Sequence, residues 1–192
     1  MKTRQTGFAY LWILGAAAEA AELERDRTGD PSVGNRSGGN LLQELINQIR
    51  EAFDAVPQPS DEELLHPDCM DDCDILQFYG GVRWQDMSDE MIVYNYAALT
   101  AFSPKAFRYY LPAYLLWTLR NADSIEYVGE AALRALDPGA PTEMLHDFRK
   151  SHYSDLDAGQ IEAVKVFLTL LGNHPDLGEY ADEALLNHWL EA

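Results

Sequence analysis

One short segment, residues 61–74 (DEELLHPDCMDDCD), holds the side chains that could do metal chemistry. It contains one histidine, both cysteines of the chain and seven acids, with no lysine or arginine. Zinc prefers imidazole nitrogen and thiolate sulfur, so His66, Cys69 and Cys73 could supply three ligands, the cysteines one helical turn apart. The usual C-x2-C spacing and a second cysteine pair are both missing. The pattern is therefore incomplete, and a fourth ligand would have to come from Asp68 or a distant histidine.

The carboxylates of this segment offer a second chemistry, the attraction of a basic partner. The seven acids are Asp61, Glu62, Glu63, Asp68, Asp71, Asp72 and Asp74. Neighbouring carboxylates disfavour thiolate, so reactive-cysteine chemistry is not expected here. The D-x-D-x-D-G spacing of a calcium loop is also absent. Two interpretations stay open, a solvated acidic surface and an acidic docking patch for a basic protein.

A third candidate lies in residues 103–117 (SPKAFRYYLPAYLLW), which predict a helix that is apolar nearly all round and therefore buried. Pro112 lacks the N–H that would bond the carbonyl of Arg108, so a bend is expected there. The Arg108 guanidinium must then either pair with a carboxylate in the core or be presented to a ligand. Trp84, in a loop earlier in the chain, is the aromatic residue expected to join Arg108 in a ligand site or on a docking surface.

The elements that must position these residues are helices throughout. Apolar residues recur at helical spacing, and Ser or Asn caps, Pro–Gly stops and Gly–Gly ends divide the chain into segments. Strand-like alternation is not found. We expect an all-α bundle of about seven to nine helices. The expected helices cover residues 41–53, 71–79, 88–102, 103–120, 124–136, 142–150, 157–171 and 176–190. Histidines outside the acidic segment are expected at the surface or at helix caps.

The first forty residues differ in composition from the rest. Residues 8–18 form an apolar run of eleven that follows Lys2 and Arg4, which fits either a signal peptide or an appended cytosolic helix over residues 8–27. The run is too short to span a membrane. Residues 28–40 are rich in Gly, Ser and Asn and predict a flexible linker. We therefore divide the chain into an N-terminal appendage, residues 1–40, and a helical domain, residues 41–192.

Charge is the most unusual property of the 192 residues. The net charge is −18, from 32 acids and 14 bases, and all of it falls in residues 41–192. Such a charge repels phosphate backbones and anionic lipid, so nucleic acid is not an expected partner, whereas a basic protein is. Two cysteines are too few for a disulfide framework and are typical of reduced, cytoplasmic thiols. Export remains the alternative if the N-terminal run is a signal peptide.

Two motifs carry a resemblance to a known group. FYGGVRWQDMS, residues 78–88, and AFSPKAFRYYLPAYLLWTL, residues 101–119, resemble a family of uncharacterised bacterial domains. The family signature, F-x-(S/T)-P-x-A-F-R-Y-Y-L-P-A-Y-L, corresponds to Phe102–Leu115, except that Phe102 stands directly before Ser103 with no residue between them, and the likeness covers about residues 41–171. The resemblance implies no activity, because the family has no established one.

Three functions remain open. The first is a non-enzymatic binding module, such as an immunity or inhibitor protein that neutralises a basic bacterial toxin, since acidic inhibitors associate fast with basic targets. The second is an adaptor subunit that docks through residues 8–27. The third is a metal protein or enzyme using His66, Cys69 and Cys73, or a site around Trp84 and Arg108. No known catalytic motif occurs, and no cofactor is expected.

Overall fold

The computed structural model describes residues 37–69 and 74–192, and within these ranges the fold is all-α, as the sequence predicts. Eight α-helices lie in the described part of the chain, within the expected number, and the β-type pairing there is one isolated bridge between Leu65 and Phe102. The appended helix over residues 8–27, the signal-peptide alternative and most of the predicted linker lie outside the described residues. The first described helix begins at Ser37, inside the range expected to be linker.

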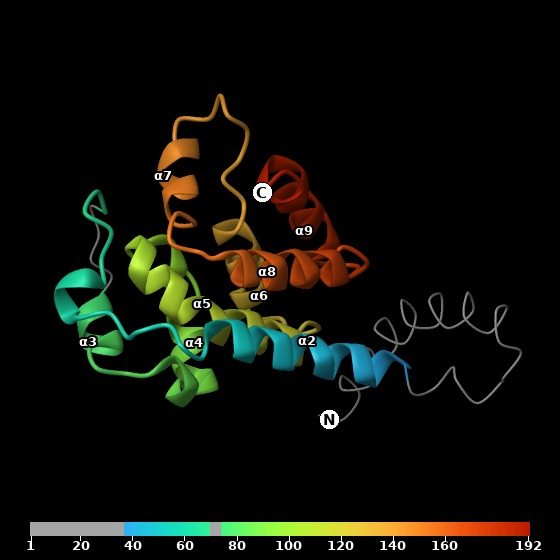
Figure 1. Ribbon diagram of the computed structural model, residues 1–192, viewed down its shortest axis with the longest axis horizontal. Helices are drawn as coiled ribbons and strands as arrows, with labels where there is room; N and C mark the ends of the chain where they lie inside the picture. Colours follow the sequence, from blue (N-terminus) through green and yellow to red (C-terminus); the bar gives the residue numbers. More distant parts are fainter. Residues whose placement is uncertain (1–36, 70–73) are drawn as a thin grey trace, which may run out of the picture.

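The helices, labelled as in Figure 1, fall into long and short ones. The long helices are α2 (Ser37–Phe53), α5 (Pro104–Arg120) and α8 (Ala158–Leu171). The shorter helices are α3 (Ile75–Tyr79), α4 (Asp89–Tyr94), α6 (Val128–Ala135), α7 (His146–Ser151) and α9 (Gly178–Ala184). Single turns η1 (Asp61–Glu63), η2 (Trp84–Asp86) and η3 (Ala98–Thr100) are 3-10, and η4 (Leu185–Trp189) is a π-helical turn.

Helix α5 is the centre of the core. Ser103 caps it by accepting a hydrogen bond from the Ala106 N–H, and Pro104 occupies its first turn, where a missing N–H costs nothing. Every residue from Ala106 to Leu119 except Arg108 is buried. Helices α2, α4 and α6 pack directly against it. The prediction of a buried central helix is confirmed.

A second layer forms from α8, α9 and the C-terminal turn η4. Asp157 and Gln160 form a reciprocal capping box at the start of α8, which packs against both α2 and α9. Trp189 is fully buried, and its indole N–H donates to the Leu136 carbonyl at 2.7 Å. In Figure 1, α3 lies at the end of the molecule away from α9.

Several expected helices are shorter than predicted, for local reasons. The helix expected over residues 88–102 ends at Tyr94, because Asn95 leaves the helical conformation and its carbonyl accepts the Tyr114 hydroxyl. The helix expected from residue 124 begins at Val128, after a turn in which Ser124 Oγ accepts the Glu126 N–H. The helix expected from residue 71 begins only at Ile75, after Asp74 in the left-handed region.

Candidate functional site

The acidic segment is fixed at its base to the start of α5. The His66 N–H donates to the Ala101 carbonyl at 2.9 Å, and the Ser103 N–H donates to the Leu64 carbonyl at 2.8 Å. Ser60 and Glu63 form a capping box that opens η1. The backbone next to Asp61 and Glu62 is therefore held to the core while the side chains of these two acids face solvent.

Most of the described acids of this segment are exposed. They are Asp61, Glu62, Asp68 and Asp74, while Glu63 is partly covered and Asp71 and Asp72 lie outside the described residues. Glu63 pairs with Lys105 at 2.5 Å, and this hydrogen bond, with those from Ser60, lowers the pKa of the Glu63 carboxyl to about 2. Asp61 and Glu62 form no ion pair within the described part of the chain. Their charges are thus available to a partner.

Exposed apolar side chains lie next to these acids, around α3. The Asp61 carboxylate abuts the end of α3, since a Cβ at Gly80 would sit 3.3 Å from Asp61 Oδ1. On α4, Tyr94 is 73% exposed and lies against Phe78 of α3, their ring centroids 5.2 Å apart. Leu76 of α3 is also exposed. We call Asp61, Glu62, Asp74, Leu76 and Tyr94 the acidic–aromatic face.

His66 is buried, and both of its ring nitrogens are engaged within the protein. Nδ1 accepts the Asp68 N–H at 3.1 Å, so Nε2 carries the proton and donates to Ser151 Oγ at 3.1 Å. The Ser151 hydroxyl in turn donates to the Phe148 carbonyl. In this arrangement His66 offers no lone pair to a metal and cannot take a proton from Ser151.

The two cysteines are not brought onto one helix by the described residues. Cys69 is half-buried in a non-helical stretch before α3, and Cys73 lies outside the described residues. Within residues 37–69 and 74–192, no three His, Cys, Asp or Glu side chains are grouped as metal ligands.

Three further histidines are buried, which corrects the expectation of surface positions. His146 Nδ1 lies 2.9 Å from the Gly139 carbonyl, and His152 Nδ1 lies 3.1 Å from the Phe148 carbonyl. His174 accepts the N–H groups of Asp176 and Leu177 before α9, which is the capping role expected. Burial lowers the pKa of His152, so its imidazole is neutral at physiological pH.

Arg108 is anchored rather than presented to a ligand. Its Nε donates to Gln160 Oε1 at 2.8 Å, and a terminal nitrogen donates to Asp157 Oδ2 at 2.9 Å. Gln160 is buried and donates onward to the Ala52 carbonyl of α2. Arg108 thereby joins α5 to the capped start of α8 and pairs with a carboxylate as one alternative expected, but the pair is partly exposed rather than buried in the core, since the Asp157 side chain is 56% exposed.

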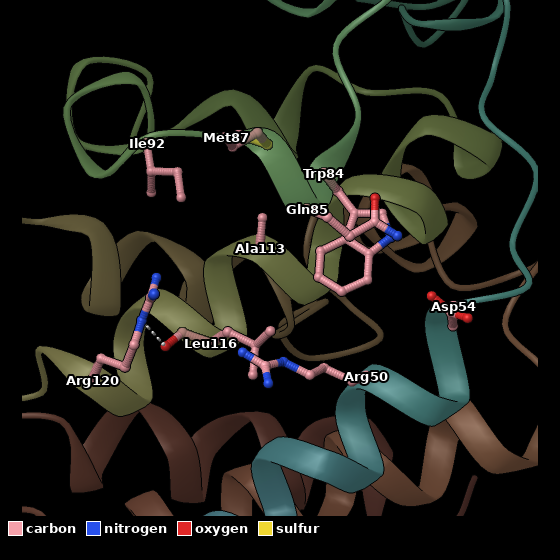
Figure 2. Close-up of a pocket in the computed structure, with 9 residues that line it drawn as sticks. All are labelled: Arg50, Asp54, Trp84, Gln85, Met87, Ile92, Ala113, Leu116 and Arg120. Carbon is pink, nitrogen blue, oxygen red and sulfur yellow. Dashed lines mark hydrogen bonds between the residues drawn. The ribbon is translucent and has the colours of Figure 1, made fainter.

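Trp84 is only 6% exposed, so it does not belong to an exposed docking surface as expected. It forms part of the wall of a pocket of about 360 Å³ between α2, η2, α4 and α5 (Figure 2). The pocket is lined by Arg50, Asp54, Trp84, Gln85, Met87, Ile92, Ala113, Leu116 and Arg120. Sequence reasoning missed Arg50 and Arg120, because an arginine in the last turn of a helix is commonplace there.

Two tyrosines of α5 hold the segment that carries Trp84 and Tyr94. The Tyr110 hydroxyl donates to the carbonyls of Tyr79 and Val82, each at 2.9 Å. The Tyr114 hydroxyl donates to the Asn95 carbonyl at 2.8 Å and accepts the Tyr79 hydroxyl at 2.6 Å. Burial raises the pKa of Tyr110 and Tyr114 well above the ordinary value, so both remain donors at physiological pH.

Comparison with known proteins places the chain in a family without naming an activity. None of the helices in the described residues is both long and apolar enough to cross a bilayer. No curated protein matches the chain, and no solved structure matches it. One family model, described as a family of unknown function (DUF6714), matches residues 41–192, further toward the C-terminus than the motifs suggest. The chain therefore belongs to the DUF6714 family.

Proposed function

We propose that this protein is a non-enzymatic binding module whose acidic–aromatic face docks a basic partner protein. The observation that carries the proposal is a group of exposed side chains around α3: Tyr94 packs against Phe78, and the Asp61 carboxylate abuts Gly80 at the end of the helix. Asp61 and Glu62 lack ion-pair partners in the described part of the chain. Tyrosine is enriched among the side chains that dominate binding energy at interfaces, because it covers a large area at little entropic cost. The surrounding carboxylates supply attraction and partner choice.

The charge of the domain supports the same partner chemistry. Residues 41–192 hold 27 acids and 9 bases, which leaves a field that steers cationic proteins toward the surface. Proteins that act on nucleic acid are often basic because they neutralise phosphates. The finer form of the proposal is thus an immunity or inhibitor protein that covers the basic active surface of a toxin.

The first experiment identifies the partner and then measures its kinetics. The full chain is used as bait in native lysate at low and high salt, and a stoichiometric basic protein is then purified for stopped-flow association. Neutralising two acids of the face, Asp61→Asn with Glu62→Gln, should lower the association rate and flatten its salt dependence. The matched control neutralises two exposed acids of α9, Glu179→Gln with Glu183→Gln, and should have a smaller effect.

The apolar part of the face is tested with the same partner. Tyr94→Ala should raise the dissociation rate, because truncating a central aromatic side chain typically weakens an interface by about 2 kcal/mol or more. Tyr127→Ala removes another exposed tyrosine outside the face and serves as the control. An unchanged Kd for both Tyr94→Ala and the doubly neutralised variant would show that the partner docks elsewhere.

We propose separately that the protein is located in the cytoplasm. The support is the low cysteine content and the acidic, soluble composition of residues 41–192. Fractionation of native cells with an antibody to the domain tests this directly. A shortened chain in an exported fraction would instead favour the signal-peptide alternative.

A further inference from the structure

The pocket beside Trp84 has an apolar wall and a positively charged side. Apolar surface comes from Met87, which follows η2, from Ile92 of α4 and from Leu116 of α5. Arg50 comes from the last turn of α2, and Arg120 from the last residue of α5. Figure 2 shows the Arg50 side chain extending from α2 toward Leu116. A volume of about 360 Å³ is in the range of small-molecule sites.

Arg50 is an unusual cation in so acidic a domain. It has no ion-pair or hydrogen-bond partner within residues 37–69 and 74–192, although the domain holds three acids for each base. Arg120 is partly engaged, since its Nε donates to the Leu116 carbonyl at 3.1 Å and a terminal nitrogen donates to Asp89 Oδ1 at 3.3 Å, while its side chain is 52% exposed. Arginine presents a planar fork of N–H donors that matches a carboxylate or a phosphate. The whole Arg50 fork and the remaining N–H groups of Arg120 can therefore donate to an anion from solvent.

A polar atom in the pocket wall is also without a partner. The indole Nε1–H of Trp84 is buried and has no acceptor among the described residues. Buried donors are nearly always satisfied in folded proteins, so an orphaned one next to a pocket needs an explanation. A ligand would provide that explanation if it brought a hydrogen-bond acceptor that the indole N–H could reach after a small shift of the ring.

The local charge selects the kind of anion. Asp54 lines the pocket, and Asp89 lies beside Arg120, so two carboxylates balance the two cations. A doubly charged phosphate would meet both carboxylates and the field of the whole domain. A singly charged carboxylate meets less of this repulsion, and an apolar body attached to it fits the apolar wall.

We propose that this pocket binds an apolar organic acid as its carboxylate, with Arg50 and Arg120 holding the carboxylate and Met87, Ile92 and Leu116 covering the apolar body. The same chemistry is offered by a free acid and by the C-terminal residue of a peptide chain. The site does not depend on the acidic–aromatic face, so it can be tested without the partner protein.

The test follows the indole N–H resonance of Trp84 in the full ¹⁵N-labelled chain, assigned by its loss in Trp84→Phe. Three probes are titrated: 3-phenylpropionate as the free acid, N-acetyl-phenylalanine as the chain end, and N-acetyl-phenylalaninamide as the same body without charge. Both acids should shift the resonance saturably, and the amide should bind at least about tenfold more weakly. Tighter binding of the free acid identifies a metabolite-type ligand, and tighter binding of the acetylated acid identifies a chain terminus.

Variants locate the carboxylate. Arg50→Gln should weaken binding of the tighter acid about tenfold or more, because it removes a charge-assisted hydrogen bond. Arg134→Gln, which loses the same charge at an exposed site paired with Glu130, should leave the affinity unchanged. The resonances of Trp117 and Trp189 report that each variant is folded. The proposal is overturned if neither acid shifts Trp84 saturably, if the amide binds as tightly, or if the two arginine variants behave alike.

Discussion

Residues 54–103 and residues 104–189 both contribute buried aromatic side chains, yet they are held in place differently. The C-terminal region consists of helices that pack against one another, with α8 contacting α9 and α6 contacting α9. In its described residues, the earlier region contains α3, α4 and three single turns, and hydrogen bonds from α5 hold parts of its backbone. Apart from Arg50, Leu116 and Arg120, the residues of the two candidate binding sites used above lie in this earlier region. The helices of residues 104–189 can therefore be stable without these binding residues, whereas the binding residues depend on those helices for their positions.

The largest effect on the free energy of unfolding is expected at Trp189, which packs in the core of the C-terminal region. Trp189→Ala removes a fully buried indole and its hydrogen bond to the Leu136 carbonyl, so the free energy of unfolding should fall by about 3–5 kcal/mol. Urea denaturation measures the loss. Leu190→Ala, at an exposed neighbouring position, should change it by less than about 1 kcal/mol. Similar effects for both variants would contradict the view that this region is the main core.

A smaller effect is expected at the junction between the two regions. Tyr114→Phe removes one of the two hydrogen bonds to the Asn95 carbonyl, which keeps the Ala98 N–H, and removes the partner of the buried Tyr79 hydroxyl, which should cost about 1–3 kcal/mol. Amide hydrogen exchange should also quicken around residues 79–95 more than in α8. The exposed Tyr127→Phe is the control. Uniform acceleration across both regions would mean that they unfold as one unit.

The ion pair between Glu63 and Lys105 should give a weaker, pH-dependent effect. Because the folded pKa of Glu63, about 2, lies below its ordinary 4.5, the carboxylate stabilises the fold above about pH 4.5. This stabilisation is lost as the pH falls toward 2. The destabilisation caused by Glu63→Gln should thus be present at neutral pH and shrink in acid. A destabilisation by Glu63→Gln that stays constant across this pH range would refute the assignment.

The least effect on stability is expected on the acidic–aromatic face itself. Tyr94→Ala removes a side chain that is 73% exposed, so the free energy of unfolding should change by no more than about 0.5 kcal/mol. Thermal unfolding of the variant measures this. A loss several times larger would make Tyr94 a structural residue and weaken the argument for a binding role.

The two regions also differ in how far the sequence predicted them. Helices α5 and α8 begin where Ser103 and Asp157 indicate, because capping depends on residues three positions apart. The end of α4 was missed, since it depends on Tyr114, far along the chain. The pocket at Trp84 was missed for the same reason, as four separate elements line it. Arg108 was recognised as needing a carboxylate, but Asp157 could be identified only from the fold.

The bridge between Leu65 and Phe102 has a consequence for how the family can vary. It brings Leu65 and Phe102 together at the start of α5, and the chain between them therefore forms a closed loop. The entropic cost of closing such a loop grows only with the logarithm of its length, by about 0.6 kcal/mol for each doubling. Family members could therefore gain or lose residues in the exposed stretches between these points, and so acquire different binding surfaces, while α4 and the other parts that pack against α5 stay intact.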